Sequence, residues 1–333
     1  MRSRLPLHLI VYRLSALGDV AMTIPAVYSC AKTWPQVTFH IVTTDFCAQL
    51  FVEAPANVSI HPVEKRMGLW KILSILNKIE ADAVADFHNV LRSWIVDVWF
   101  LMRGKRVCML TKNRLKRKAL FRKAKCDTTP FTQRYFDVFA RLGLSCTPCF
   151  KTVFKTLPPI PLNMKKAEER WIGIAPFARY KNKTYPLDKM QQVVCLLAKQ
   201  SSTRIFLFGG RGEQADILAG WERFSPCVHS VAGCFSLAEE LSLMAHLDVM
   251  LSMDSANQHM ASLVDTRAVT IWGSTTPACG FMGWNQKETD AVYFNLVCQP
   301  CNVGASNICY KKTLDCLEKL KYQDIIRQIN RKA

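Results

Sequence analysis

The first residues of this chain that could do chemistry follow its first predicted strand. The apolar run Leu7–Tyr12 predicts a strand, and the segment Arg13–Val20 leads from it into a predicted helix. Ligands of open parallel sheets bind at this carboxyl edge. Asp19 has two interpretations: a helix cap that accepts hydrogen bonds from backbone N–H groups, or a general base that faces a substrate hydroxyl. The residues alone leave both open.

A second group of candidates is basic. Arg179, Lys181 and Lys183 cluster between the predicted strand Trp171–Pro176 and a predicted helix that starts at Pro186. A helix N-terminus adds partial positive charge, so this turn suits a phosphate or a pyrophosphate. The alternative is a basic loop that is merely solvated.

A third group follows the predicted strand Val249–Ser252. Asp254 and Ser255 open a predicted helix that contains His259, and the first N–H groups of that helix could hold a phosphate. Asp254 could equally be a helix cap, and His259 a buried core residue.

A fourth group is glycine-rich. Gly209 and Gly210 follow the predicted strand Arg204–Phe208 and allow close backbone approach. Glu213 then begins a helix, where it could accept hydrogen bonds from ribose hydroxyls or complement the helix dipole.

Short β-rich runs alternate with helix-length amphipathic segments, which is typical of βαβ units and a parallel sheet covered on both faces. In the first half we predict strands at Leu7–Tyr12, Val37–Val42, Val58–Val63, Ala83–Phe87 and Arg106–Leu110, and the longer helices at Val20–Lys32, Leu69–Ile79 and Ser93–Met102.

The alternation is interrupted at residues 154–161, which hold three prolines in eight positions. Proline fixes φ and lacks an N–H donor, so this stretch predicts an extended connector; a surface loop within one domain is the alternative. We predict one domain over residues 1–155 and another over 156–333, with a ligand cleft between them. The basic amphipathic segment Leu314–Asn330 predicts a last helix, which could pack back on the N-terminal domain.

The charge of the chain favours anionic partners. Its 44 Lys and Arg against 26 Asp and Glu give a formal charge of +18, which suits nucleic acid, an acidic membrane surface or a phosphorylated substrate. No apolar run approaches the roughly 18 residues of a membrane span. Arg13 and Asp19 interrupt the apolar start, so we predict no signal peptide and expect a cytosolic protein.

Two function classes lose support. The chain has no Gly-x-Gly-x-x-Gly fingerprint, which counts against a nicotinamide or flavin enzyme. It also has no recognised nucleic-acid-binding motif, although its charge would permit that function.

In their order and spacing, these segments resemble the glycosyltransferase family of ADP-heptose:lipopolysaccharide heptosyltransferases, family nine of the sequence classification. The resemblance runs from about Leu9 to about Cys316. Its best-matched parts are Arg13–Val20 with Pro25-Ala26, Lys183–Pro186, Phe208–Gly210, and Asp254-Ser255 with His259.

This resemblance implies a GT-B fold, in which two Rossmann-like domains with parallel sheets face a central cleft. The N-terminal domain would bind the acceptor and the C-terminal domain the nucleotide sugar. It implies an inverting, metal-independent transfer of a heptosyl residue from ADP-heptose to the lipid A–Kdo acceptor of the lipopolysaccharide inner core, with no cofactor.

The resemblance also assigns roles to residues. Asp19 would be the general base, Lys183 would bind phosphate, and Glu213 would hold the ribose. Asp254 would be the acid of the donor-site loop, and the N–H groups from Ser255 to His259 would lie near the phosphates.

The chain departs from the family pattern in two places. Ala256-Asn257 stand where the family has a glycine and often a proline or small residue, and Ala178 and Arg179 replace small hydroxyl residues. The alternative function is therefore a relative that uses another nucleotide sugar or lacks transfer activity.

A basic segment marks the N-terminal half. Between residues 103 and 125, 11 of 23 residues are Lys or Arg and none is acidic. We expect Arg114, Lys116, Arg117 and Lys118 to meet phosphorylated lipid A core and the anionic inner face of the cytoplasmic membrane. The alternative is a solvated basic loop.

Four cysteines near the C-terminus are the remaining candidates. Cys298, Cys301, Cys309 and Cys316 could form a tetrahedral thiolate site, but the spacing is not a standard zinc pattern. Reduced thiols or a local disulfide are the alternatives, and no catalytic role is expected.

Overall fold

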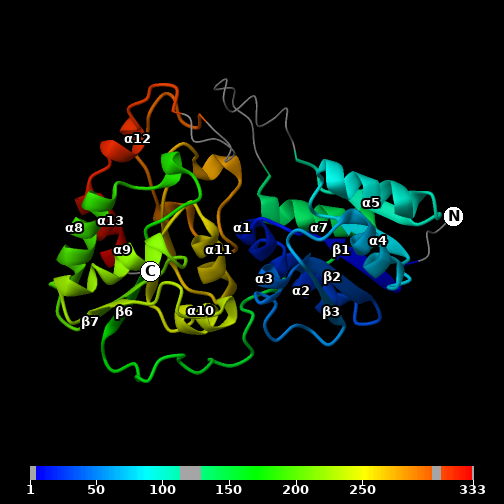
Figure 1. Cartoon of the computed structure of the whole chain (residues 1–333), viewed down its shortest axis with the longest axis horizontal. Helices are drawn as coiled ribbons and strands as arrows, with labels where there is room; N and C mark the ends of the chain where they lie inside the picture. The colour runs from blue at the N-terminus through cyan, green and yellow to red at the C-terminus, as the bar shows by residue number, and fades with distance from the viewer. Residues whose placement is uncertain (1–4, 113–128, 302–308, 332–333) are drawn as a thin grey trace. The chain divides into compact units, whose positions relative to one another are not determined.

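The computed structural model describes residues 5–112, 129–301 and 309–331. The chain divides into two α/β units (Figure 1). Among the described residues, the first unit holds 5–112 and 129–155, and the second holds those from 156 onward. Each unit has its own sheet. In the described part of the chain, no helix is both long and apolar enough to cross a membrane.

The first sheet is entirely parallel and has the strand order β3-β2-β1-β4-β5. Its strands are β1 His8–Tyr12, β2 Thr38–Thr44, β3 Val58–Val63, β4 Ala83–Asp86 and β5 Arg106–Met109. The helices of this unit are α1 Leu17–Ala21, α2 Ile24–Thr33, α3 Asp45–Ala48, α4 Leu69–Asn77, α5 Leu91–Leu101 and α7 Phe131–Arg141. Apolar residues of β1 and β4 form one buried cluster with α4 and α5, while α7 contacts α2 and β5.

One predicted helix of this unit is two helices. The segment Val20–Lys32 is divided into α1 and α2 at Met22 and Thr23. Pro25 lies in the first turn of α2, where its missing N–H costs nothing, whereas inside a continuous helix it would remove a hydrogen bond and clash with the preceding turn. The proline therefore starts a new helix.

The second sheet is also parallel and has the order β11-β10-β9-β6-β7-β8. Its strands are β6 Arg170–Ala175, β7 Thr203–Leu207, β8 Val228–Ser230, β9 Val249–Met253, β10 Ala268–Ile271 and β11 Ala291–Val292. Its α-helices are α8 Leu187–Ala198, α9 Glu213–Ala219, α10 Leu237–Met244, α11 Ala256–Leu263, α12 Asp315–Glu318 and α13 Tyr322–Asn330. The 3-10 turns are η1 Lys181–Lys183, η2 Glu222–Phe224, η3 Pro277–Cys279 and η4 Glu288–Asp290.

The last predicted helix is divided in the structure. The segment Leu314–Asn330 forms α12 and α13 rather than one helix. The apolar residues Ile325 and Ile329 of α13 are buried in the core of the second unit, and α13 packs on α8. The apolar face of α13 thus fills its own unit, and packing of this helix on the N-terminal domain stays a prediction.

The two sheets share an arrangement that positions loops. In each sheet the first strand lies in the interior, so the later strands are added on both of its sides: β1 lies between β2 and β4, and β6 between β7 and β9. The order of strands reverses at these points, where the two flanking loops diverge and leave room for a ligand.

Candidate active site

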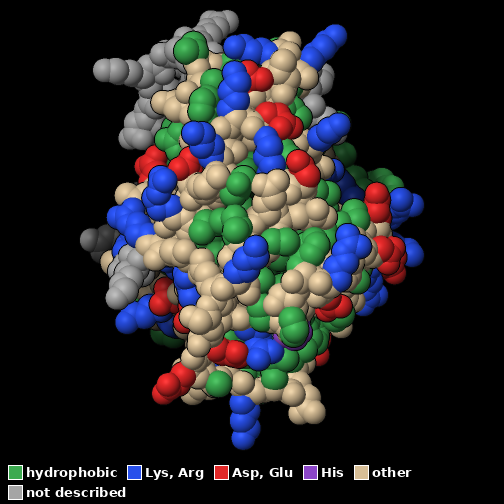
Figure 2. All heavy atoms as spheres, turned by 90° about the vertical axis from the view of Figure 1, so that its left-hand side faces the viewer, with side chains coloured by type: hydrophobic (Ala, Val, Ile, Leu, Met, Phe, Trp, Pro, Cys, Tyr) green, Lys and Arg blue, Asp and Glu red, His purple; other side chains and the backbone are tan. Residues whose placement is uncertain are grey.

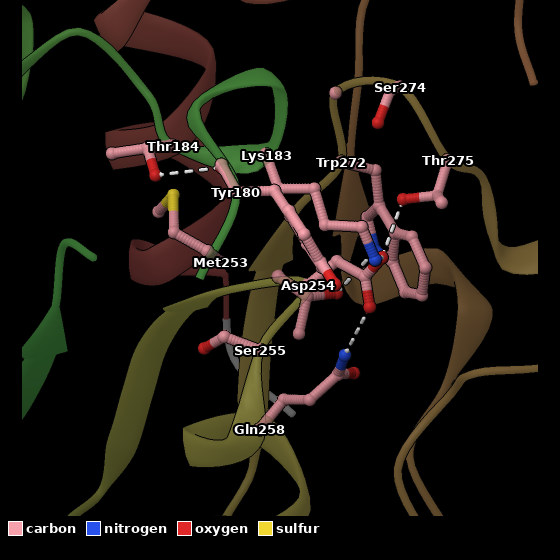
Figure 3. A network of polar contacts seen from close by, with 12 residues as sticks. Tyr180, Lys183, Thr184, Met253, Asp254, Ser255, Gln258, Trp272, Ser274 and Thr275 are labelled. Carbon is pink, nitrogen blue, oxygen red and sulfur yellow. Dashed lines mark hydrogen bonds and ion pairs between the residues drawn. The ribbon is translucent and has the colours of Figure 1, made fainter. Parts of the chain in front are cut away.

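The second unit places two opposite charges together at the carboxyl edge of its sheet (Figure 3). Lys183 ends the turn η1 that follows β6, and Asp254 directly follows β9. Because β6 and β9 are paired, the loops after them are neighbours. Lys183 Nζ lies 2.6 Å from Asp254 Oδ2, and the two side chains are only 10% and 4% exposed. The structure thus brings together two residues that we assigned to donor binding.

Two further elements donate hydrogen bonds to Asp254. Thr275 Oγ1, after β10, lies 2.5 Å from Asp254 Oδ2, and Gln258 Nε2 on α11 lies 3.2 Å from Oδ1. Figure 3 shows both side chains converging with Lys183 on the carboxylate. These contacts offset the cost of burying the charge. Sequence reasoning missed Thr275 and Gln258; polar residues directly after β10 and one turn into α11 were the available signal.

The turn that carries Lys183 is held by a close backbone contact. Ser274 N donates to Asn182 O over 3.0 Å. A Cβ on the neighbouring Gly273 would lie 2.5 Å from the same oxygen, so only glycine permits this approach. The loop after β10 therefore fixes both Thr275 and the turn that carries Lys183.

The three bases of this turn do not share one environment. Arg179 and Lys181 are exposed, whereas Lys183 is buried in its ion pair. The turn therefore presents two cations to solvent and keeps a third beside Asp254.

The other predicted donor-site residues lie at the same sheet edge but in different settings. Ser255 is the residue before α11, and its Oγ lies 3.2 Å from Ser252 Oγ. His259 is buried within α11. Glu213 is exposed at the start of α9, after β7, which is a neighbour of β6. The ion pair therefore has Ser255 beside it in sequence, while Glu213 reaches the edge from the other side of β6.

In the first unit, Asp19 lies on α1 after β1, and its side chain is 30% exposed. Arg13 Nη2 lies 2.5 Å from Asp19 Oδ2. Ala16 N also donates to this oxygen over 3.3 Å, which is a helix-capping contact. The structure therefore satisfies the capping interpretation and still leaves part of the carboxylate accessible, as a general base requires.

Arg13 is anchored on both sides. It is 8% exposed, and its Nη1 donates to Phe87 O over 2.5 Å. Burial lowers the pKa of Arg13, but the attraction to Asp19 and other anionic groups outweighs it and raises the pKa overall. The guanidinium therefore stays charged and orients the carboxylate.

His88 is a further polar residue at this edge of the first sheet, and the sequence analysis did not single it out. It follows β4, the strand beside β1, and Leu14 N donates to its Nδ1 over 3.2 Å. Burial and the nearby Arg13 lower the pKa of His88 to about 4, so the ring is neutral at pH 7. Asp86 Oδ1 holds the loop by accepting from His88 N over 2.7 Å. A polar run directly after a strand that flanks β1 was the available signal.

The remaining predicted groups are less defined. Arg114, Lys116, Arg117 and Lys118 lie outside the described residues. Cys298, Cys301, Cys309 and Cys316 are not in disulfides, and burial and then the other three thiols raise the pKa of Cys316 to about 12. Within the described ranges, no group of three or more ligating side chains is arranged to hold a metal ion. The thiolate site stays a prediction.

Two parallel-sheet α/β units, together with the likeness to solved heptosyltransferases reported below, give this chain a GT-B fold. The family model for glycosyltransferase family 9 (heptosyltransferase) matches residues 69–310. The chain belongs to this family and is a glycosyltransferase. The resemblance found in the sequence and the predicted fold class are confirmed.

Relatives and solved structures agree with this assignment. The chain is 20% identical over 282 residues to lipopolysaccharide heptosyltransferase 3 of Escherichia coli, covering 78% of this chain and 81% of that protein. It is 22% identical over 324 residues to lipooligosaccharide heptosyltransferase 2 of Campylobacter jejuni, covering 95% and 96%.

The fold is shared with E. coli heptosyltransferase WaaC bound to ADP-2-deoxy-2-fluoro heptose, at a TM-score of 0.67, 18% identity and coverage of 94% and 98%. It is also shared with a family 9 glycosyltransferase from Veillonella parvula, at a TM-score of 0.73, 15% identity and coverage of 96% and 95%.

Proposed function

We propose that this protein transfers a heptosyl residue from ADP-heptose to the lipid A–Kdo acceptor of the lipopolysaccharide inner core, with inversion at the anomeric carbon. The proposal rests on two ion pairs, Arg13–Asp19 and Lys183–Asp254. Each lies where the strand order of its own sheet reverses. The named activities of the relatives supply the donor and acceptor classes.

In this proposal Asp19 removes the proton from an acceptor hydroxyl. The hydroxyl oxygen then attacks the anomeric carbon from the side opposite the diphosphate. The new C–O bond forms as the bond to the ADP oxygen breaks, the proton stays on Asp19, and ADP leaves with the electron pair. Arg13 holds the carboxylate in place, so the base needs no reorganisation at the moment of reaction.

The leaving diphosphate needs positive charge, which the second unit provides through its own side chains. Arg179 and Lys181 are exposed on the turn that carries Lys183, and α11 starts directly after Asp254-Ser255. We assign phosphate binding to Lys183 and to the first N–H groups of α11, and ribose binding to Glu213. This chemistry is metal-independent, so transfer should continue at an undiminished rate in EDTA.

The proposed reaction takes place at the inner face of the cytoplasmic membrane, where the protein associates peripherally. The acceptor is anchored in lipid, and the basic segment with Arg114, Lys116, Arg117 and Lys118 supplies charge for anionic headgroups. This association should weaken as salt concentration rises.

The donor sugar is tested with a panel. Calorimetric titration with ADP, ADP-heptose, UDP and GDP separates the proposed donor from another nucleotide sugar, which the Ala256-Asn257 departure leaves as the alternative. Binding of UDP or GDP in preference to ADP would contradict an ADP-linked donor.

Substitution of Asp19 tests the base. Asp19→Asn should lower the transfer rate by roughly 10²-fold or more, as expected when a general base is removed, and should leave the affinity for ADP-heptose unchanged. Asp45→Asn is the control, because Asp45, like Asp19, is an acid in the first turn of a helix of this unit, and Asp45 is exposed. An Asp19→Asn enzyme as active as the Asp45→Asn control would contradict the assigned role.

A further inference from the structure

Helix α5 turns an apolar side toward solvent. Leu91, Trp94, Ile95, Val98 and Leu101 are 74%, 43%, 47%, 53% and 54% exposed, and Met102, directly after the helix, is 77% exposed. Their spacing of three and four residues places them on one side of the helix. We name these six residues the α5 apolar face.

This face is not the side that packs on the unit. Ser93, Val96, Asp97 and Phe100 are buried on the opposite side, and Val96 and Phe100 share a core cluster with apolar residues of α4. An amphipathic surface helix normally shows polar residues where α5 shows its apolar face. The helix is therefore apolar on two sides, and only one of them is used by the fold.

Helix α4, which lies next to α5, also carries an exposed aromatic residue. The Arg92 guanidinium donates to Met67 O, before α4, and the Arg103 guanidinium donates to Asn77 Oδ1, at its end. The two helices therefore run side by side in the same direction (Figure 1). Trp70, in the first turn of α4, is 77% exposed.

The surroundings of the α5 apolar face are predominantly basic, with Glu64 and Glu80 the exposed acids that flank α4. Arg66, Lys71 and Arg103 are exposed around the two helices, and the Arg103 guanidinium lies 4.0 Å from the ring centroid of Trp99. Helix α4 contains no acidic residue, and Asp97, the only acid on α5, is buried. The face of the second unit that carries α8 and α13 differs, because acidic and basic side chains are interspersed there (Figure 2).

We propose that the α5 apolar face inserts into the surface of an anionic lipid bilayer. Exposed apolar residues with tryptophan on one side of a helix and Lys and Arg at its border are the pattern of helices that lie in the membrane interface. At 11 residues, α5 is too short to span a bilayer. A second copy of the chain is a poorer occupant, because it would bring two basic borders together.

This inference extends the membrane association proposed above, but it stands on the α5 apolar face and does not depend on the transfer reaction. It also differs in kind from the contact of the basic segment. Electrostatic attraction is screened by salt, whereas burial of apolar side chains persists at high salt. The two contributions can therefore be measured separately.

The test is sedimentation of the full-length protein with vesicles of three parts phosphatidylcholine to one part phosphatidylglycerol. The variant Ile95→Gln/Val98→Gln removes apolar surface without touching the buried side of α5. We expect at least tenfold weaker binding at low salt, and loss of the binding that remains at high salt. The matched control is Leu157→Gln/Val297→Gln, which changes two exposed apolar residues of the second unit, 68% and 89% exposed; its binding should equal that of the wild type.

Several outcomes would overturn the inference. One is equal vesicle binding by the wild type and the α5 variant; another is no binding by the wild type. A third is a concentration-dependent dimer without vesicles that the α5 variant abolishes, since the face would then be an interface between two copies. Transfer to a delipidated acceptor reports on the proposed function instead: its failure in the wild type, with vesicle binding intact, would remove the heptosyltransferase proposal and leave this inference standing.

Discussion

At the scale of single residues, Lys183 is bound within the protein before any substrate arrives. The side chain of its partner Asp254 is only 4% exposed, and the ion pair is enclosed by Thr275 and Gln258. A substitution that removes the lysine therefore changes two properties together, namely donor binding and the electrostatic balance of the buried site. Loss of nucleotide binding in a Lys183 variant is evidence for donor binding by Lys183 only when the effect on the stability of the buried site is measured separately.

The separation needs a pair of variants. Lys183→Met should lower the free energy of unfolding by about 3–5 kcal/mol, because it leaves an uncompensated buried carboxylate. Adding Asp254→Asn removes that charge and should restore much of the stability, while ADP binding stays weak. Urea unfolding and calorimetric titration with ADP measure the two effects.

Lys189→Met is the control for the first effect. Lys189 Nζ lies 2.8 Å from Glu318 Oε2, but Glu318 is 49% exposed, so this surface pair should contribute about 1 kcal/mol or less. Two results would contradict the interpretation: a Lys183→Met protein as stable as this control, or a double variant that binds ADP as tightly as the wild type.

At the scale of elements, three histidines connect neighbouring strands of the first sheet. His8 Nδ1 on β1 lies 3.1 Å from His40 Nε2 on β2, and His40 Nδ1 lies 3.0 Å from His61 Nε2 on β3. Burial, and then the charges of its two neighbours, lower the pKa of His40 to about 4. The folded state therefore favours the neutral form of His40 over the protonated form.

This row of histidines predicts acid sensitivity. A histidine with a lowered pKa stabilises the fold above its unfolded pKa, near 6.5, and that contribution is lost as the pH falls toward the folded value near 4. We expect the melting temperature to fall across this range, and the fall to be smaller in His40→Gln. Thermal unfolding in matched buffers at pH 7, 6, 5 and 4 measures it; the same slope in both proteins would show that the row plays no part.

Elements could be predicted from the sequence where local residues decide them. The strand Val58–Val63 has the predicted bounds, because a β-rich run is closed by turn residues on both sides. The predicted helices at 20–32 and 314–330 are each divided, since amphipathic spacing continues across a break that proline or backbone geometry imposes. The outward side of α5 could not be predicted, because periodicity shows that a helix has two sides but not which side is packed.

The candidate site was predictable only in part, for the same reason. Asp19, Lys183 and Asp254 all follow strands, so the rule for parallel sheets found them. Which residues pair with one another could not be found locally: the contact between Lys183 and Asp254 spans 71 positions, and that between Arg13 and Phe87 spans 74. Such contacts depend on strand order, which alternation alone does not give.

At the scale of the whole molecule, the two units offer separate reporters. Trp171, Trp221 and Trp272 are buried in the second unit and Trp284 is half-buried, whereas in the first unit Trp70 and Trp94 are exposed and Trp34 and Trp99 are half-buried. The largest part of the shift of tryptophan emission on unfolding should therefore come from the second unit. This asymmetry can locate a ligand without a crystal.

Saturating ADP should raise the melting temperature reported by tryptophan emission. A ligand at about 100 times its Kd stabilises the state that binds it by about 2.7 kcal/mol, which corresponds to several degrees for a domain of this size. The control is the same titration with the Lys183→Met/Asp254→Asn variant, which should show little shift. An equal shift in that variant would place ADP elsewhere, and no shift in the wild type would count against a nucleotide donor.

The strand order of the two sheets has a consequence for how the chain is made. In each sheet the strand that leaves the ribosome first, β1 or β6, is interior, and every later strand is added to an edge that already exists. In the first sheet β2 joins β1, β3 joins β2, β4 joins β1 and β5 joins β4. The second sheet grows in the same order from β7 to β10, and β11 is then added to β10. No strand has to wait for a partner that has not yet been synthesised. Both sheets can therefore grow outward during translation, and the first can be complete before the second begins.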